Sequence, residues 1–328
     1  MEIVTADYHT AGEPYRIVTG GVEVPPGRTV LDRRSWAQEN LDRVRKLLIN
    51  EPRGHADMYG CFVTPPDDDG AEFGMVFFHK DGFSTACGHG TIAGATWALD
   101  SGLVSASEPD TRFCVDVPSG RVEVTASIEA GQVVGVRFTN VPSWVAAKSV
   151  RIELDGRDLD VDVSYGGAFY ASCDVGQLGL NIESEHLDEL IRLGRKIKWA
   201  VNDHPAVRHP DDDRLSGCYG TIWYQAVGPL HQRNVTIFAD GEVDRSPCGS
   251  GTSARLALLE HDRELATDQE LRHESIIGTV FTGRVVRVVV ESGVRQVITE
   301  VGGRAFPTGH HRFVLHPDDP VGTGFQLR

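Results

Sequence analysis

The sequence predicts an α+β fold, because strand-like and helix-like stretches are mixed along it without the regular rhythm of βαβ units. Residues 276–316 are almost continuously β-like, whereas residues 185–200 carry the clearest helical pattern. The chain of 328 residues is long enough for about two domains and can bury a substantial core without disulfide bonds.

The first part of the chain is expected to be mainly β. One helix is expected near residues 35–48, with Ser35 as its N-cap and with Pro52 and Gly54 ending it. β-Strands are expected within residues 1–24, 61–64, 73–78, 113–117, 120–128 and 132–140. The last three strands are rich in valine and separated by glycines, which is typical of a β-meander.

A domain boundary is expected near residues 145–150, and the second part of the chain follows it. The helix over residues 185–200 has Ser184 as its expected N-cap. Its apolar side chains recur at helical spacing on one face: Leu187, Leu190, Ile191, Ile197 and Ala200. Strands are expected at residues 217–227 and 234–239 and over most of 276–316.

Composition excludes several classes of function. The net charge of −15 argues against a nucleic-acid partner, which needs a basic face, and gives no attraction to anionic membranes. No apolar run is long enough to span a bilayer, and the N-terminus lacks the pattern of a signal peptide. We therefore expect a cytoplasmic protein whose cysteines are free thiols. Four of the six cysteines are expected to be small buried hydrophobic side chains: Cys61, Cys114, Cys173 and Cys218.

The other two cysteines open an internal repeat. Residues 87–93 read Cys-Gly-His-Gly-Thr-Ile-Ala, residues 248–254 read Cys-Gly-Ser-Gly-Thr-Ser-Ala, and five of the seven positions match. Each copy follows a β-rich stretch and precedes a helix-like segment, residues 91–99 or 253–260. Glycines let backbone amides approach a ligand, and a helix N-terminus attracts an anion such as a carboxylate. The same terminus lowers the pKa of a thiol.

Two such motifs facing one cleft would place one sulfur on each side of a bound carboxylate. Cys87 and Cys248 could then remove a proton from a stereocentre and return one to the far face. Amide donors aimed at the carboxylate would stabilise the charge that develops in between. This chemistry requires neither a metal nor an organic cofactor.

Other interpretations remain open at this point. Each repeat fits the pattern G-x-G-x-x-A of a dinucleotide site, but the first follows a polar turn rather than a strand. The two thiols could be structural, and zinc is a third option, although Cys87 and His89 lack the paired cysteines of structural zinc sites. His89 and Asp244 could contact a ligand, or serve as a buried histidine and a turn or cap residue.

The motifs resemble the paired signatures of the proline racemase family. These are residues 86–90, Ala-Cys-Gly-His-Gly, and residues 244–251, Asp-Arg-Ser-Pro-Cys-Gly-Ser-Gly. Residues 9–14, 51–55 and 165–170 match further blocks of that family, so the resemblance runs nearly end to end. The family includes proline racemases, 4-hydroxyproline 2-epimerases and trans-3-hydroxy-L-proline dehydratases.

The resemblance implies a fold like that of diaminopimelate epimerase, with two pseudo-symmetric α/β halves. Each half would wrap strands around a central helix, with the active site in the cleft between them. The halves would be residues 1–147, joined by the C-terminal strand 306–328, and residues 148–305. We also expect a homodimer as the assembly to test.

The resemblance assigns roles to the site residues as well. Cys87 and Cys248 would be the catalytic acid/base pair, with no cofactor and no metal. Four residues would hold the carboxylate and neighbouring atoms of a small-molecule substrate: Gly88, His89, Gly249 and Ser250. Asp244 would contact the ring nitrogen of proline or hydroxyproline.

The expected reaction depends on Cys248. Several blocks are closest to trans-3-hydroxy-L-proline dehydratases, among them residues 51–60, 165–170 and 219–222, yet those dehydratases typically carry threonine at the second catalytic position. A thiol there supplies a second acid, so we expect a 2-epimerase or racemase of proline or hydroxyproline. The alternatives are a trans-3-hydroxy-L-proline dehydratase, in which Cys87 starts the elimination of water, and a non-catalytic binder of proline-like ligands.

Overall fold

The computed structural model describes residues 1–291 and 293–327, which fold into two compact units. The first unit comprises Met1–Phe138 and Arg304–Arg328, and the second comprises Thr139–Gly303. Both units combine β-strands with helices, so the expected α+β class is confirmed. Among the described residues, no helix has the length and apolar character needed to cross a membrane.

The first unit is built from eight strands and three helices within the described residues. Its strands are β1 (Glu2–Thr10), β2 (Glu13–Gly20), β3 (Gly60–Thr64), β4 (Phe73–Phe78), β5 (Asp110–Val117), β6 (Gly120–Glu129), β7 (Gln132–Thr139) and β17 (Ala305–Val314). Strand β1 pairs antiparallel with β2 and β17. From β2 the pairing continues through β3, β4 and β5 to β6.

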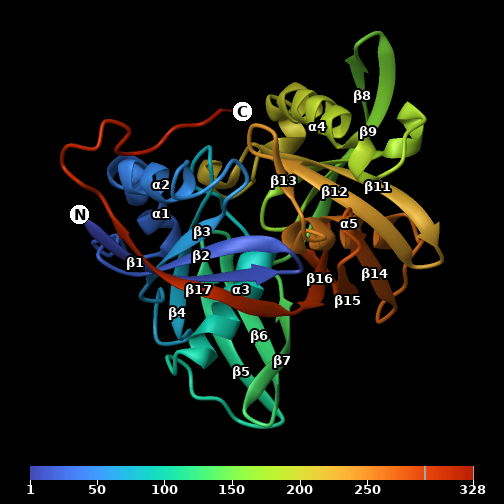
Figure 1. Cartoon of the computed structure of the whole chain (residues 1–328). Helices are drawn as coiled ribbons and strands as arrows, with labels where there is room; N and C mark the ends of the chain where they lie inside the picture. Colours follow the sequence, from blue (N-terminus) through green and yellow to red (C-terminus); the bar gives the residue numbers. More distant parts are fainter. Residues whose placement is uncertain (292, 328) are drawn as a thin grey trace. The chain divides into compact units, whose positions relative to one another are not determined.

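Helix α3 (Gly88–Asp100) is the central helix of the first unit. It lies against β1, β2, β6 and β17 (Figure 1), and only Trp97 and Asp100 among its residues are not buried. This burial explains why the helix is apolar or small on all sides instead of amphipathic. The start of α3 is therefore held from several directions by the surrounding strands.

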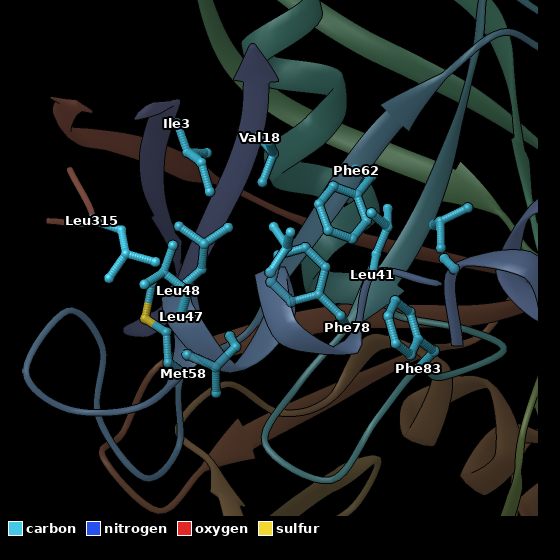
Figure 2. Packing of buried hydrophobic residues seen from close by; sticks show 14 of the residues in the cluster. Ile3, Val18, Leu41, Leu47, Leu48, Met58, Phe62, Phe78, Phe83 and Leu315 are labelled. Atoms are coloured by element: carbon cyan, nitrogen blue, oxygen red, sulfur yellow. The ribbon is translucent and has the colours of Figure 1, made fainter. Parts of the chain in front are cut away.

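Two shorter helices, α1 (Val30–Asn40) and α2 (Asp42–Ile49), pack over the apolar core of the same unit. Figure 2 shows Leu41, Leu47 and Leu48 beside Phe62 and Phe78, whose ring centroids are 4.7 Å apart. A fully buried leucine or phenylalanine contributes about 1.5–3 kcal/mol to stability, so this cluster anchors the helices to the sheet.

The predicted N-cap of this helical region is wrong. Thr29, not Ser35, caps α1: its hydroxyl accepts a hydrogen bond from Asp32 N–H at 3.1 Å, and Asp32 accepts one from Thr29 N–H at 3.2 Å. This reciprocal pair is a capping box, which fixes the helix start more firmly than a lone serine. The helix predicted as continuous is also interrupted at Leu41.

The second unit has strands on both sides of a second buried helix, α5 (Gly249–His261). Its strands are β8 (Trp144–Leu154), β9 (Arg157–Tyr165), β10 (Phe169–Asp174), β11 (Cys218–Gly228), β12 (His231–Phe238), β13 (Glu242–Asp244), β14 (Glu270–Ser275), β15 (Val280–Glu291) and β16 (Val294–Gly303). Pairing runs from β8 through β9, β10, β11 and β12 to β14, β15 and β16. Strand β13 pairs with one end of β12.

Helix α4 (Leu187–Asn202) covers β11 and β12 in this unit. The helix predicted over residues 185–200 is confirmed, but its expected cap is wrong. Ser184 begins a short 3₁₀ turn, Ser184–His186, and the α-helix starts only after it. Three further 3₁₀ turns lie at Val175–Leu178, Pro205–Val207 and Asp213–Leu215.

The six cysteines are free thiols, as expected. Cys61, Cys173 and Cys218 are buried, and burial raises the pKa of each of these thiols to about 12. Cys114 is only half-buried, which corrects its assignment as a core side chain.

Candidate active site

The two copies of the repeat occupy equivalent places in the two units. Cys87 is the residue before α3 and Cys248 the residue before α5, and each helix has 13 residues. Both side chains are 5% exposed. The helices begin earlier than expected, at Gly88 and Gly249, so these glycines supply first-turn amides that have no carbonyl partner within their own helix.

In the first unit the Cys87 sulfur is held by its own motif. It accepts a hydrogen bond from Gly90 N–H at 3.3 Å, and the two ring nitrogens of His89 lie 3.5 and 3.6 Å away. The Cys87 carbonyl accepts from Thr91 through both N–H and hydroxyl, at 2.9 Å each, which starts the helix. The thiol therefore faces an amide donor and an imidazole together.

His89 is buried among aromatic rings. Its ring meets those of Tyr15 and Tyr59 edge to face, with centroids 5.6 and 5.0 Å apart, and its carbonyl accepts a hydrogen bond from Thr10 at 2.9 Å. Burial lowers the pKa of His89 to about 3. The imidazole is therefore neutral near pH 7 and offers one N–H donor but no positive charge.

Gly90 is required by close packing around this thiol. A Cβ at this position would lie 2.7 Å from the Cys87 sulfur and 2.4 Å from the Tyr15 ring. Gly251, the matching glycine of the second motif, is packed in the same way: an added Cβ there would lie 2.9 Å from the Cys248 sulfur. In both units the sulfur thus lies directly over backbone without a side chain.

Cys248 differs from Cys87 in its backbone. Its φ is 63°, a backbone conformation that residues other than glycine rarely adopt, whereas Cys87 is extended with φ of −155°. The strained segment is fixed by neighbours, because Cys248 N–H donates to the Ser246 hydroxyl at 3.1 Å and the Asn234 amide donates to the Pro247 carbonyl at 2.8 Å. Such strain is often found at functional sites.

Two side chains of the second unit approach the Cys248 sulfur or its helix. The Tyr170 hydroxyl lies 3.6 Å from that sulfur and 2.7 Å from the Ser250 hydroxyl. The Asp244 carboxylate accepts hydrogen bonds from Ser246, from its N–H at 2.8 Å and from its hydroxyl at 2.6 Å. Asp244, Ser246 and Ser250 are all buried.

The pKa values of this half of the site run against one expectation. Burial, together with the nearby Asp244 carboxylate, raises the pKa of Cys248 to about 12, although Tyr170 and the Gly251 amide act in the opposite direction. The expected lowering by the helix N-terminus is therefore outweighed, and Cys248 is a protonated thiol near pH 7. Burial also raises the pKa of Asp244 to about 6, although its bonds to Ser246 oppose that shift.

The structure brings the predicted site residues together within each unit. Cys87 and His89 form the first group with Gly88, and the second group consists of Asp244, Cys248, Gly249 and Ser250. Sequence reasoning missed two neighbours of these groups, Tyr15 and Tyr170. Tyr170 ends one of the family-like blocks, which was a signal that the position matters, but nothing local to Tyr15 marked it.

Within residues 1–291 and 293–327, no three His, Cys, Asp or Glu side chains gather in a way that could hold a metal ion.

Comparison with known proteins identifies the family. The family model described as proline racemase matches residues 5–326. A trans-3-hydroxy-L-proline dehydratase of Bacillus cereus is 43% identical, over 98% of this chain and 97% of that protein. A 3-hydroxyproline 2-epimerase of Burkholderia multivorans is 41% identical, over 99% of this chain and 98% of that protein.

A solved structure agrees with these relatives. The crystal structure of a hydroxyproline epimerase from Agrobacterium vitis, with bound trans-4-hydroxy-L-proline, superimposes with a TM-score of 0.94 at 32% identity. The match covers 99% of this chain and 96% of that one. The chain belongs to the proline racemase family and is an enzyme of the racemase/epimerase or hydro-lyase type.

Proposed function

We propose that the chain is a cofactor-independent 2-epimerase of a 3-hydroxyproline, in which Cys87 and Cys248 act on opposite faces of the α-carbon. The observation that supports this proposal is the thiol of Cys248, which immediately precedes α5 as the thiol of Cys87 immediately precedes α3. A second thiol is needed to return a proton to the far face, whereas simple binding of the substrate does not need one.

The choice of ring substituent rests on the relatives. Two relatives, at 43% and 41% identity, are named for activities on 3-hydroxyproline. The structural relative that holds trans-4-hydroxy-L-proline is less similar, at 32% identity. We therefore expect 3-hydroxyproline to be the preferred substrate, ahead of 4-hydroxyproline and proline.

The proposed reaction begins at Cys87. Its thiolate takes the α-proton while the first-turn amides of α3 and α5 hold the substrate carboxylate, where negative charge accumulates. Cys248, a thiol near pH 7, gives its proton to the other face of the same carbon. One proton is thus lost to Cys87 and one gained from Cys248, and the configuration at C2 is inverted.

The remaining site residues are assigned to substrate binding. Asp244, with its pKa raised to about 6, is mostly ionised near pH 7 and would pair with the ring ammonium. The neutral imidazole of His89 would donate its one N–H to the carboxylate or to the Cys87 sulfur. Ser250 would contact the carboxylate through its backbone amide, because its hydroxyl is bonded to Tyr170.

Dehydration of trans-3-hydroxy-L-proline is the second candidate. It is favoured by the identity of 43% to a dehydratase of that substrate. This reaction would begin in the same way, with removal of the α-proton by Cys87. The electron pair would then break the bond to the 3-hydroxyl group, which takes up the proton held by Cys87 and leaves as water. The product would be a cyclic enamine acid that isomerises to the imine, and no second protein acid on the far face is needed.

Proton NMR in D₂O separates these reactions. Purified enzyme is incubated separately with trans-3-hydroxy-L-proline, trans-4-hydroxy-L-proline and L-proline. We expect the α-proton signal of the 3-hydroxy substrate to disappear as a new diastereomer forms. Conversion of that substrate to the cyclic imine alone would establish the dehydratase, and an unchanged α-proton in all three would overturn both candidates.

We also propose the cytoplasm as the location and a homodimer as the assembly. Light scattering of the purified protein tests the assembly, since a monomer has a mass of 35.8 kDa and a dimer twice that value.

A further inference from the structure

Tyr170 is a buried side chain that takes no part in the proton transfers of the proposed reaction. It lies on β10, which pairs with β9 and β11, and its ring packs edge-on against Tyr219 with centroids 5.6 Å apart. The sheet thereby fixes the hydroxyl at 3.6 Å from the Cys248 sulfur and 2.7 Å from the Ser250 hydroxyl.

This hydroxyl matters because Cys248 changes its charge during the proposed reaction. Once the thiol has given its proton to the substrate, a thiolate is left in a site that is 5% exposed. A buried anion without hydrogen-bond donors is strongly unfavourable, so the thiolate must be matched by donors already in place. The Gly251 amide, in the first turn of α5, is one such donor. The Tyr170 hydroxyl, on strand β10, offers another.

We propose that Tyr170 is a positioning residue for Cys248: its hydroxyl donates to Ser250 while Cys248 is a thiol and to the sulfur once Cys248 is a thiolate. No proton leaves Tyr170 in this change, because only its hydroxyl rotates. Ser250 then donates to the Tyr170 oxygen, so both hydroxyls keep a partner at 2.7 Å. This inference rests on the proposed function, in which Cys248 is the proton donor.

The charged groups around Cys248 do not replace Tyr170 in this role. Asp244, from β13, repels a thiolate, and Arg245 next to it partly opposes the rise in the pKa of Asp244. On β14, His273 is bonded to Thr252 of α5 at 2.8 Å and is neutral near pH 7, since burial lowers its pKa to about 3. Two side chains near this sulfur favour the thiolate, Tyr170 and Thr236, and the contact of Tyr170 has the larger effect.

Tyr170→Phe tests the proposal, because it removes one hydroxyl and keeps the ring that packs against Tyr219. Losing a hydrogen bond to a charged group should lower kcat/KM for epimerisation about 10- to 100-fold. The loss must be equal in the two directions, since the equilibrium constant of the reaction is fixed. Tyr8→Phe is the matched control: it removes a hydroxyl bonded to Asp100 at 2.9 Å, at the far end of α3.

A second measurement reports on the thiolate without using activity. In a Cys87→Ser background, the rate at which iodoacetamide alkylates Cys248 is followed by mass spectrometry from pH 7 to 10. Below the pKa of the thiol this rate is proportional to the thiolate fraction, so Tyr170→Phe should slow it about 10- to 100-fold at every pH. Tyr8→Phe should leave it unchanged, and a purely structural loosening would speed it up.

The outcomes separate this inference from the proposed function. Alkylation of Cys248 at the wild-type rate or faster in Tyr170→Phe overturns the role of Tyr170, whatever happens to activity. A wild-type enzyme that epimerises none of the three substrates overturns the proposed function instead. Slower alkylation in Tyr170→Phe would even then support the contact between this hydroxyl and the thiolate.

Discussion

Replacing Gly90 by alanine tests whether the thiol of the first unit depends on bare backbone beneath it. The new Cβ would lie 2.7 Å from the Cys87 sulfur and 2.4 and 2.6 Å from two atoms of the Tyr15 ring. Favourable contacts between such atoms are about 3.5–4.0 Å long, so the substitution creates an overlap of about 1 Å. Tyr15 is fully buried, so the sulfur or the start of α3 must move.

The size of the effect follows from this overlap. A misplacement of about 1 Å at a reacting atom can lower a rate on the order of 10²-fold. Overpacking lowers the free energy of unfolding by about 1–3 kcal/mol, and the better helix propensity of alanine offsets about 1 kcal/mol of that loss. We therefore expect kcat to fall about 100-fold, with a loss of up to about 2 kcal/mol in the free energy of unfolding.

The assay compares epimerisation of trans-3-hydroxy-L-proline with urea unfolding of the same samples. Gly135→Ala is the control, because a Cβ at Gly135 would meet nothing within 4 Å. It should keep wild-type kcat and stability. Wild-type kcat in Gly90→Ala, together with increased stability, would refute the argument, because the helix would then have gained from alanine without disturbing the thiol.

Three further predictions concern the thiols and the buried histidine. Cys248→Ser should lower the rate of epimerisation about 10²–10⁴-fold, the usual contribution of one general acid or base, while dehydration started by Cys87 persists. Chiral chromatography measures both reactions, and an equal loss of both rates would contradict separate roles for the two thiols. Iodoacetamide should inactivate the wild-type enzyme, and trans-3-hydroxy-L-proline should slow this inactivation; a rate indifferent to substrate would remove the thiols from the site. Burial lowers the pKa of His273 to about 3, so its contribution to stability is present above pH 6.5 and declines as the pH falls towards 3. Between pH 7 and pH 5, the free energy of unfolding measured with urea should fall by about 2 kcal/mol less in His273→Gln than in wild type. An equal fall in both proteins would mean that the folded protein also protonates this histidine.

Much of the fold could be predicted because its strands follow local rules. β4 was predicted with the bounds Phe73–Phe78, and the meander of β5, β6 and β7 was recognised from valine-rich runs separated by glycine. The helix starts were less accurate, although Thr29 and Asp32 do form the spacing of a capping box in the sequence. That spacing predicts a helix that starts after Thr29.

The site was predictable only where it is contiguous. Cys87, His89, Cys248 and Ser250 lie within short motifs whose glycines and helix starts carry a physical meaning. Tyr170 reaches Cys248 across 78 positions, because the pairing of β10 with β9 and β11 brings it there. The raised pKa of Cys248 was equally hidden, since burial depends on the packing of the whole unit and not on the motif.

The two copies of the motif hold their thiols differently, and this bears on the choice of reaction. Cys87 is extended and bonded within its own motif, whereas Cys248 has φ of 63°, a strained conformation that costs about 1–3 kcal/mol. That strain is retained by contacts from Ser246 and Asn234, and it places the sulfur beside Tyr170. Epimerisation and dehydration would share their first step at Cys87, so the surroundings of Cys248 must determine which one follows.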